Sequence, residues 1–302
     1  MYHSASRVQL QIRAVRGMRR KKRNPYSKRE RSMKKHLSTI ILVFVFLVGL
    51  SVVLYPTISD YWNSKTQTRA IAAYQESMKD MKQEDYTSYF EAAEDYNNRL
   101  RETPGAFTDP SLVAGYEDTL DISGTGVMGY ITIEKIGVEL PIYHGTEEGT
   151  LQIAAGHLEG SSLPIGGAGT HAVISAHRGL PSAKLFTNLD ELEKGDTFTI
   201  TVMNRVLTYE VDQIAIVEPE DTEKLQIVDG QDYCTLLTCT PYGINTHRLL
   251  VRGTRIATTE KPQIYVAAEA QRMDPLLVAP LVAVPMLLIL LIYLLIRYRR
   301  KK

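Results

Sequence analysis

The segment Tyr233–Ile256 places a thiol and a guanidinium where they could act together. Its first run, Tyr233–Cys239, is rich in Thr and Leu, and its second, Arg248–Ile256, alternates apolar residues with Arg, Gly and Thr. Both patterns predict strands, and the Pro, Gly and Asn between them are typical of a loop that joins an antiparallel pair. Cys239 would then face Arg248, a cation that can favour thiolate and stabilise an oxyanion on a carbonyl.

His177 is a candidate for the proton carrier that such a pair requires. The segment 170–176 predicts a strand that runs into a turn at residues 177–181, so three strand ends could bring imidazole, thiol and guanidinium to one mouth. Periodicity alone does not select this histidine from the others in the same part of the chain, which are His144, His157, His171 and His247.

Three ordered motifs in this region resemble those of the sortase family. Thr235–Cys239 (TLLTC) resembles the family's TLxTC signature. Ser175–Gly179 (SAHRG) resembles the segment around the sortase histidine, and Asn245–Leu249 (NTHRL) resembles the segment around the arginine. The resemblance covers roughly residues 126–256.

This resemblance implies a mainly β fold, a closed eight-stranded barrel, and acyl transfer through a thioacyl intermediate. Cys239 would be the nucleophile, His177 the general acid and base, and Arg248 the oxyanion stabiliser. Sortases cleave an LPxTG-like sorting signal between Thr and Gly and join the threonine to an amine. The sequence contains no C-x-x-C or H-x-x-x-H spacing, and neither a cofactor nor a metal ion is expected.

The arrangement of the chain, with two apolar segments, one on either side of the barrel, and a loop before it, resembles that of the pilus-assembling class C sortases. In that class a lid holds an aspartate against the catalytic arginine and an aromatic side chain over the cysteine. The corresponding lid residues are Asp109, Pro110 and Ser111, so the resemblance predicts a latch from Asp109 to Arg248. Because Ser111 stands where the aromatic residue is usual, Phe107 and Tyr116 are candidates to replace it.

The class C reading predicts that the amine acceptor is a pilin lysine and that the donors are pilins bearing an LPxTG-like signal. One alternative is a housekeeping sortase that joins surface proteins to a cell-wall peptide. A plain cysteine peptidase would release a free acid instead of forming a new amide. From another class, the chain could be a non-catalytic scaffold for pilus assembly, in which case Cys239 would be dispensable.

The two apolar segments, residues 37–55 and 275–296, predict transmembrane helices. The first has no charge over about 28 Å of helix, close to the roughly 30 Å hydrocarbon layer. A cleaved signal peptide is the alternative for the first segment, and a buried core helix for the second. The first segment is longer than the apolar part of a signal peptide and no small-x-small cleavage site follows it, which favours a retained span. The second segment is followed by a basic stretch, which favours a transmembrane helix.

The charge distribution predicts the topology of the chain. Residues 1–36 hold 13 Lys or Arg against one acidic residue, and residues 297–302 hold five more, which leaves the middle of the chain strongly acidic. By the positive-inside rule both termini are cytoplasmic and the catalytic domain is extracellular. The basic leader is expected to contact anionic membrane lipid, and nucleic-acid binding is not expected.

The remaining segments complete a predicted order of domains. A basic leader (1–36) and the first span precede a membrane-proximal segment (56–105) of two helices broken near residues 83–85. A lid-like loop (106–121), the barrel (122–258), a tether (259–274), the second span and a basic tail (297–302) follow. Within the barrel, further short strands are predicted at residues 128–133, 137–143, 197–203 and 206–217, and the Gly-rich residues 156–167 predict a loop. Residues 184–192 predict a helix, and residues 204–205 predict a tight hairpin turn.

The two cysteines are not expected to form a disulfide. Cys234 and Cys239 lie five residues apart on one predicted strand, which separates them by roughly 16 Å and directs them to opposite faces. A disulfide requires Cα atoms within about 7 Å. Cys239 is therefore predicted to be a free thiol, and Cys234 an ordinary packing residue.

Overall fold

The computed structural model describes residues 25–258, and the side chains of residues 41–258. The chain divides into two units, Met1–Val53 and Leu54–Lys302. The first 24 residues of the predicted leader, the tether (259–274), the second span (275–296) and the tail (297–302) lie outside the described residues.

Helix α2 (Pro25–Ser77) contains the first predicted span, residues 37–55. Its part from Ile41 is long and apolar enough to cross a membrane, with a mean hydropathy of 2.6 over its most apolar window. Large side chains on this part are open to solvent; Phe44, for example, is 65% exposed and Val53 is 73% exposed. Among the described residues no other helix meets these criteria.

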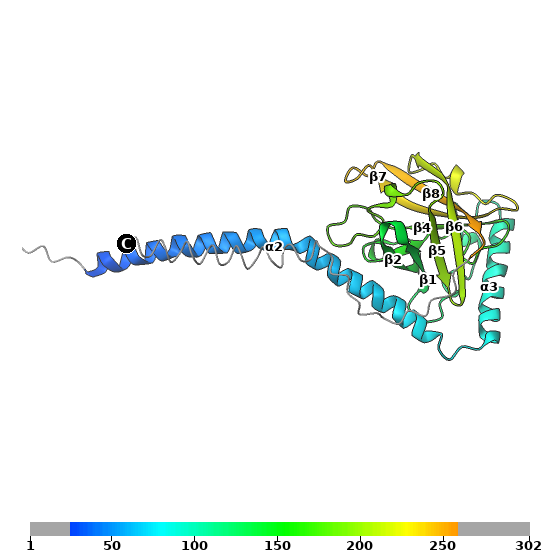
Figure 1. The fold of residues 1–302 in the computed structure, drawn as a ribbon, viewed down its shortest axis with the longest axis horizontal. Coiled ribbons are helices and arrows are strands. Elements are labelled where there is room, and N and C mark those ends of the chain that lie inside the picture. Colours follow the sequence, from blue (N-terminus) through cyan, green and yellow to red (C-terminus); the bar gives the residue numbers. More distant parts are fainter. Residues whose placement is uncertain (1–24, 259–302) are drawn as a thin grey trace, which may run out of the picture. The chain divides into compact units, whose positions relative to one another are not determined.

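Eight strands form a closed barrel in the order β1-β2-β3-β4-β7-β8-β6-β5 (Figure 1). The pairs β2–β3 and β4–β7 are parallel and the other neighbours are antiparallel. The strands are β1 (Val127–Ile133), β2 (Val138–His144), β3 (Ala155–His157), β4 (Thr170–Ser175), β5 (Thr197–Val202), β6 (Arg205–Val217), β7 (Asp232–Thr240) and β8 (His247–Ile256). This architecture confirms the fold predicted from the sequence.

Alternate side chains of the strands fill the barrel. Ile174, Leu236 and Val251 belong to the main buried cluster, whereas Val173 and Leu250 belong to a separate cluster. Because successive strand residues point to opposite faces, the separate cluster lies on the outside of β4, β7 and β8.

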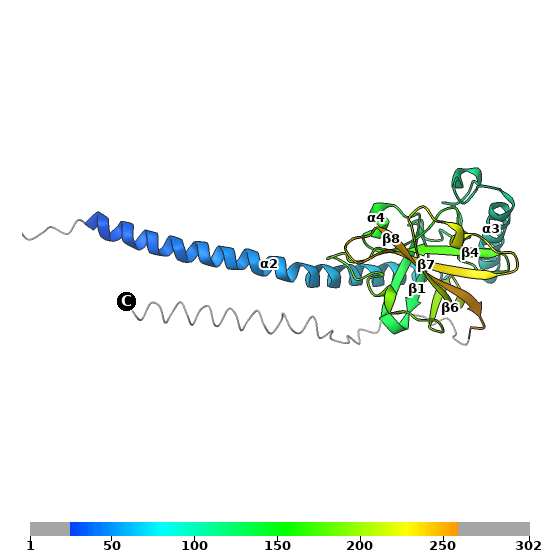
Figure 2. The same ribbon diagram turned by 90° about the horizontal axis from the view of Figure 1, so that it is seen from above.

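Helix α3 (Gln83–Glu102) packs on the barrel with one apolar face. Its buried residues recur at helical spacing, at positions 90, 93, 97 and 100. Asn97 adds two hydrogen bonds: its Nδ2 donates to the carbonyl of Leu163 (3.2 Å), and its Oδ1 accepts from the Leu163 amide (2.7 Å). Figures 1 and 2 both show α3 beside the barrel. The break between α2 and α3 falls at residues 78–82, slightly before the predicted position.

The other helical segments are short. α4 has one turn, and the rest are 3-10 turns. Their bounds are η1 (Pro110–Leu112), η2 (Glu134–Ile136), α4 (Glu148–Leu151), η3 (Leu189–Glu191) and η4 (Glu223–Leu225).

Three local predictions were wrong. Strand β3 was expected to be loop, because three residues that include Gly156 give no periodic signal. The predicted helix 184–192 forms only η3: Leu185 has a positive φ of 41°, and the Phe186 amide donates to the carbonyl of His177. The β5–β6 turn is made by residues 203–204, one position earlier than predicted.

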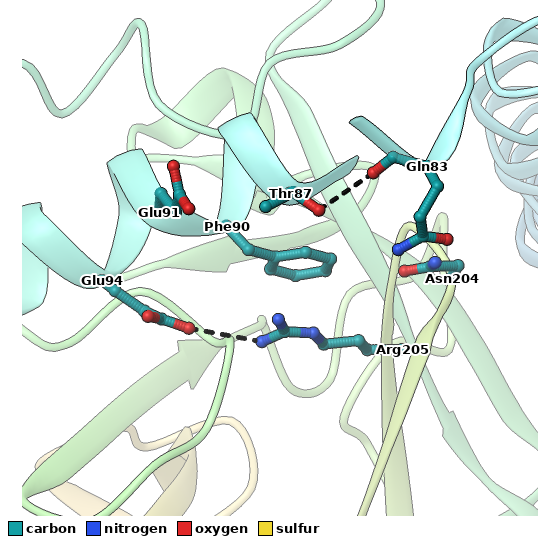
Figure 3. Close-up of a pocket in the computed structure, with 7 residues that line it drawn as sticks. All are labelled: Gln83, Thr87, Phe90, Glu91, Glu94, Asn204 and Arg205. Atoms are coloured by element: carbon teal, nitrogen blue, oxygen red, sulfur yellow. Dashed lines mark hydrogen bonds and ion pairs between the residues drawn. The ribbon is translucent and has the colours of Figure 1, made fainter. Parts of the chain in front are cut away.

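A cavity of about 340 Å³ separates α3 from the β5–β6 turn (Figure 3). Arg205 crosses it, with its guanidinium 3.5 Å from the centre of the Phe90 ring and 3.6 Å from the carboxylate of Glu94. Arg205 begins β6, whereas Val217 at the other end of β6 pairs with Arg248. The cavity therefore lies at the opposite end of that strand from the predicted catalytic residues.

Two histidines are buried in the neutral form. His157 Nε2 donates to the carbonyl of Ser162 (2.8 Å), and its Nδ1 lies 2.9 Å from the hydroxyl of Tyr116. His171 Nδ1 donates to a backbone carbonyl (2.9 Å), and its Nε2 lies 2.7 Å from the hydroxyl of Thr235. Each neutral ring thus donates one hydrogen bond and accepts one. Burial lowers the pKa of each imidazole to about 4.

Because these two histidines are buried in the neutral form, we expect the free energy of unfolding to fall as the pH is lowered. In the unfolded chain they bind protons near pH 6.5, but the folded chain resists protonation until about pH 4, so unfolding takes up protons between these values. Each histidine should lower the free energy of unfolding by about 2 kcal/mol between pH 7 and pH 5. Unfolding of the full chain in detergent checks this. The His171→Asn variant should show a shallower pH dependence, and an unchanged dependence would contradict the assignment.

Candidate active site

Strand register brings Cys239 on β7 and Arg248 on β8 to the same level as His177, which follows the end of β4. Cys239 and Arg248 are direct partners in the antiparallel β7–β8 pair. On the other side of β7, Ser175 at the end of β4 is level with Leu237; His177 and Cys239 each follow two residues later, His177 beyond the end of β4 and Cys239 still within β7. The Ala176 amide donates to the Leu237 carbonyl (3.2 Å), which keeps the two chains together beyond β4. Neighbouring strands lie about 4.8 Å apart, so the three side chains project from adjacent backbone positions.

These residues lie on the outer face of the barrel. Cys239 is two residues after Leu237, and Arg248 is two residues before Leu250. Leu237 and Leu250 belong to the cluster outside the barrel. Cys239, His177 and Arg248 are all partly exposed. The thiol is therefore not sealed in the barrel interior, and a substrate could reach it from outside.

The two cysteines differ in environment, although they share β7. Both are free, and Cys234 is completely buried inside the barrel. Burial raises the pKa of the Cys234 thiol well above its ordinary value, so this cysteine stays protonated. Only Cys239 combines exposure with a neighbouring guanidinium.

Arg248 differs from the other arginines near these strands in having no carboxylate partner among the described residues. Its Nη1 donates to the carbonyls of Asn245 (3.3 Å) and His247 (3.1 Å). By contrast, Arg252 forms two hydrogen bonds to Asp212, of 3.0 and 2.7 Å. The guanidinium of Arg248 keeps further N–H donors available for a negative charge that develops beside Cys239.

Arg178, the residue after His177, is held in a different arrangement. Its guanidinium pairs with Asp190 at 2.5 Å and donates to the Thr240 hydroxyl at 3.4 Å. Its side chain is only 9% exposed. These contacts connect the turn after His177 to η3 and to the end of β7, which suits a structural residue.

A carboxylate that sequence analysis missed approaches His177. Glu148 opens helix α4, and its Oε2 lies 3.6 Å from His177 Nε2. Gln152 Nε2 donates to Glu148 Oε1 at 3.0 Å. The pKa of Glu148 is lowered, first by the Gln152 hydrogen bond and then by the charge of His177. Nothing in the local sequence of residues 145–149 indicates this contact, which depends on how β2, α4 and β3 are connected.

The predicted lid contacts the same outer face through Phe107. This side chain packs, as Leu237 does, against the outer cluster of Val173, Val217, Leu225 and Leu250. The backbone of residues 106–107 approaches Gly160 so closely that a Cβ there would lie 2.8 Å from the Phe107 oxygen. An aromatic ring from the lid therefore covers the strands that carry the candidate catalytic residues.

The other lid residues do not make the contacts that were expected. The carboxylate of Asp109 accepts a hydrogen bond from Ser111 (2.6 Å), and within residues 41–258 it forms no ion pair with Arg248. Both Asp109 and Ser111 are exposed, and Pro110 begins η1. Tyr116 is buried, with its hydroxyl bonded to His157. Of the two candidate aromatic residues, only Phe107 lies on the outer cluster.

Comparison with known proteins identifies the fold. A family model described as the sortase domain matches residues 131–256. The crystal structure of sortase C1 from Streptococcus agalactiae is 50% identical, covers 63% of this chain and 99% of its own, and has a TM-score of 0.58. The chain belongs to the sortase family. Sortases are cysteine transpeptidases that act on LPxTG-type signals and amine acceptors, and the family is associated with the cell surface.

Two further sortases support this assignment. Streptococcus pneumoniae sortase C, whose structure was described as giving insight into catalysis and pilin substrate specificity, is 45% identical, covers 64% of this chain and 98% of its own, and has a TM-score of 0.57. Sortase D of Bacillus subtilis is 31% identical over 131 residues, which is 42% of this chain. The match spans 63% of the length of that curated relative. The likeness to sortases C agrees with the class indicated by the sequence.

Proposed function

We propose that this sortase is a membrane-anchored transpeptidase that polymerises pilin subunits, with Cys239, His177 and Arg248 as its catalytic residues. The observation that carries this proposal is the alignment of the three residues on the outer face, where Arg248 has no carboxylate partner among the described residues. Such a guanidinium supports oxyanion binding, because a paired one would already be neutralised.

The first step is attack by the Cys239 thiolate on the threonine carbonyl of an LPxTG-like signal. A C–S bond forms, the carbonyl oxygen becomes an oxyanion, and Arg248 donates hydrogen bonds to it. As the intermediate collapses, the Thr–Gly bond breaks and His177 gives its proton to the leaving amine. The products are a thioester on Cys239 and a free glycine amine.

The second step transfers the acyl group to an amine. His177, now neutral, takes a proton from the incoming amine, which attacks the thioester carbonyl. Arg248 again stabilises the oxyanion, and collapse releases the Cys239 thiolate with a new amide. Water would give a free acid instead, as in a peptidase, so the acceptor must reach the thioester before water does.

The acceptor in this proposal is a lysine of another pilin subunit. Support comes from the 45% identity to Streptococcus pneumoniae sortase C, a protein described in connection with pilin specificity. The loop before the barrel, with Asp109 and Pro110, also resembles that class in sequence. The alternative acceptor is a cell-wall peptide, which would make the enzyme a housekeeping sortase.

The test mixes the full-length protein in detergent with a pilin-like protein that carries an LPxTG-like signal. Covalent ladders joined through a lysine side chain, identified by mass spectrometry, are the expected product. Cleavage that leaves only free threonine acid would indicate a peptidase. Transfer to a short cell-wall-type peptide with no ladders would support the housekeeping alternative. Ladders that form equally well with Cys239→Ala would contradict the enzymatic proposal and favour a scaffold.

We further propose that both termini are cytoplasmic and that the barrel is extracellular. The apolar part of α2 and the basic composition of residues 1–36 and 297–302 support this topology. Protease added to cells whose wall has been removed should cleave the barrel and leave both termini protected. Digestion of either terminus from outside would contradict it.

The lid is proposed to restrict access to Cys239 mainly through Phe107. Replacing Phe107 by alanine removes an aromatic contact with the outer cluster, so labelling of Cys239 by a methanethiosulfonate reagent should accelerate on the order of ten-fold. The rate of labelling, followed by mass, is the measurement.

Asp109→Ala is the matched control for the lid. Its carboxylate contacts Ser111 rather than Arg248, so this variant should change the labelling rate by less than about two-fold. Equal acceleration in both variants would restore the aspartate latch. An unchanged rate in Phe107→Ala would remove the aromatic side chain from the account of the lid.

A further inference from the structure

The carboxylate of Glu148 is the charged group nearest to the ring nitrogen of His177 that is hidden from solvent. His177 Nε2 has no solvent-accessible surface and no hydrogen-bond partner in the described part of the chain. Glu148 Oε2 lies 3.6 Å from this atom. That separation is too long for a hydrogen bond but short enough for an ion pair when the imidazole is protonated.

The chain fixes this carboxylate from two sides. The crossover from β2 to β3 places α4 at the end of the barrel, where the close approach of Gly145 to Gly156 leaves no room for a Cβ on Gly156. Gln152, one turn further along the chain, donates to the second oxygen of Glu148. The carboxylate is thus directed toward His177 although its side chain is 72% exposed.

We propose that Glu148 is a positioning residue, which orients the His177 ring and stabilises its protonated form during acyl transfer. The inference rests on the proposed function, since it requires His177 to be the acid and base of that reaction. Glu148 does not touch the reacting atoms, and its effect passes through the imidazole.

The chemistry explains why such a residue is useful. A thiol and an imidazole with ordinary pKa values of about 8.5 and 6.5 form the thiolate–imidazolium pair in only about 1% of molecules. A carboxylate near the imidazole increases this fraction, because it lowers the energy of the positive charge. For an exposed carboxylate, the measured strength of surface ion pairs corresponds to an increase of about two- to five-fold.

Several other charges surround His177, and the pH dependence must be interpreted with all of them. Cys239 is next to it on β7, and Arg248 lies one strand further. Arg178 follows in sequence, but Asp190 neutralises it. Neither Arg248 nor Arg178 can stabilise an imidazolium, so the stabilising charge on this side comes from Glu148.

The test measures the pH–rate profile of the acylation step, with the full-length protein and a fluorogenic LPxTG-like peptide in the absence of an amine acceptor. Glu148→Gln should lower the rate two- to five-fold and move the acidic limb of the profile to lower pH, because the imidazolium loses its proton more readily without the carboxylate. Glu148→Asp should recover part of the loss. Gln152→Ala, which releases the carboxylate without removing it, should give an intermediate profile.

Glu147→Gln is the matched control, because it removes an equal charge from the adjacent residue, whose side chain is exposed. Its profile should match the wild type. An equal shift in Glu147→Gln and Glu148→Gln would reduce the effect to general surface charge and overturn the proposal. So would an acylation rate and pH profile of Glu148→Gln equal to those of the wild type. Loss of all activity in Cys239→Ala tests the proposed function separately.

Discussion

Replacing Cys239 by alanine should lower transpeptidation at least about a thousand-fold, to the background of the assay. The thiol forms the bond that carries the acyl group, and no other described cysteine can replace it, since Cys234 is buried in the barrel. The rate of amide formation between an LPxTG-like peptide and an amine measures this loss. The thermal unfolding midpoint should change little, because Cys239 lies outside the main core.

Cys234→Ala is the matched control on the same strand. It removes a fully buried sulfur, so it should lower stability while transpeptidation at a permissive temperature stays within a few-fold of wild type. If Cys234→Ala abolished activity and Cys239→Ala did not, the assignment of the nucleophile would be wrong.

Replacing Arg248 by alanine should lower the rate constant of acylation by about a hundred- to a thousand-fold, with a much smaller effect on peptide KM. This magnitude is typical of losing one oxyanion donor, which acts mainly in the transition state. Arg248→Lys should recover only part of the loss, because an ammonium cannot present the planar set of donors of a guanidinium. Single-turnover kinetics with saturating peptide measure the effect.

Arg252→Ala provides the comparison, four residues along β8. That guanidinium is already bonded to Asp212 and lies over the ring of Tyr233, so its removal should reduce stability and leave acylation nearly unchanged. Equal losses of acylation in the two variants would indicate a general need for positive charge on β8, not a specific oxyanion donor.

Alternation of apolar and polar residues was sufficient to predict most of the barrel. Seven strands were located within one or two residues, because each has enough positions to show a period of two. Strand β3 has only three residues and is held by pairing with β2 and β4, which no local pattern records. The helix prediction for residues 184–192 failed for a related reason. Leu185, Phe186 and Leu189 are all buried, and the tertiary contacts that bury them override helix propensity.

The candidate site was predictable where register alone determines it. Cys239 and Arg248 are partners across one hairpin, so two strand patterns and a loop length were enough to place them together. The position of Glu148 depends on a crossover between distant strands, and the sequence gives no measure of that path. The orientation of Asp109 depends on a turn in which the Thr108 and Asp109 amides both donate to the carbonyl of Gly105. That turn directs its carboxylate to Ser111.

Mass spectrometry of the full-length protein, mixed with an LPxTG-like peptide and quenched in acid, would detect the thioacyl intermediate itself. We expect an adduct on Cys239 whose mass corresponds to the peptide up to its threonine, and we expect it to disappear as a new amide forms when an amine is added. If no such adduct formed under conditions of turnover, or if it lay on another residue, Cys239 would not be the nucleophile.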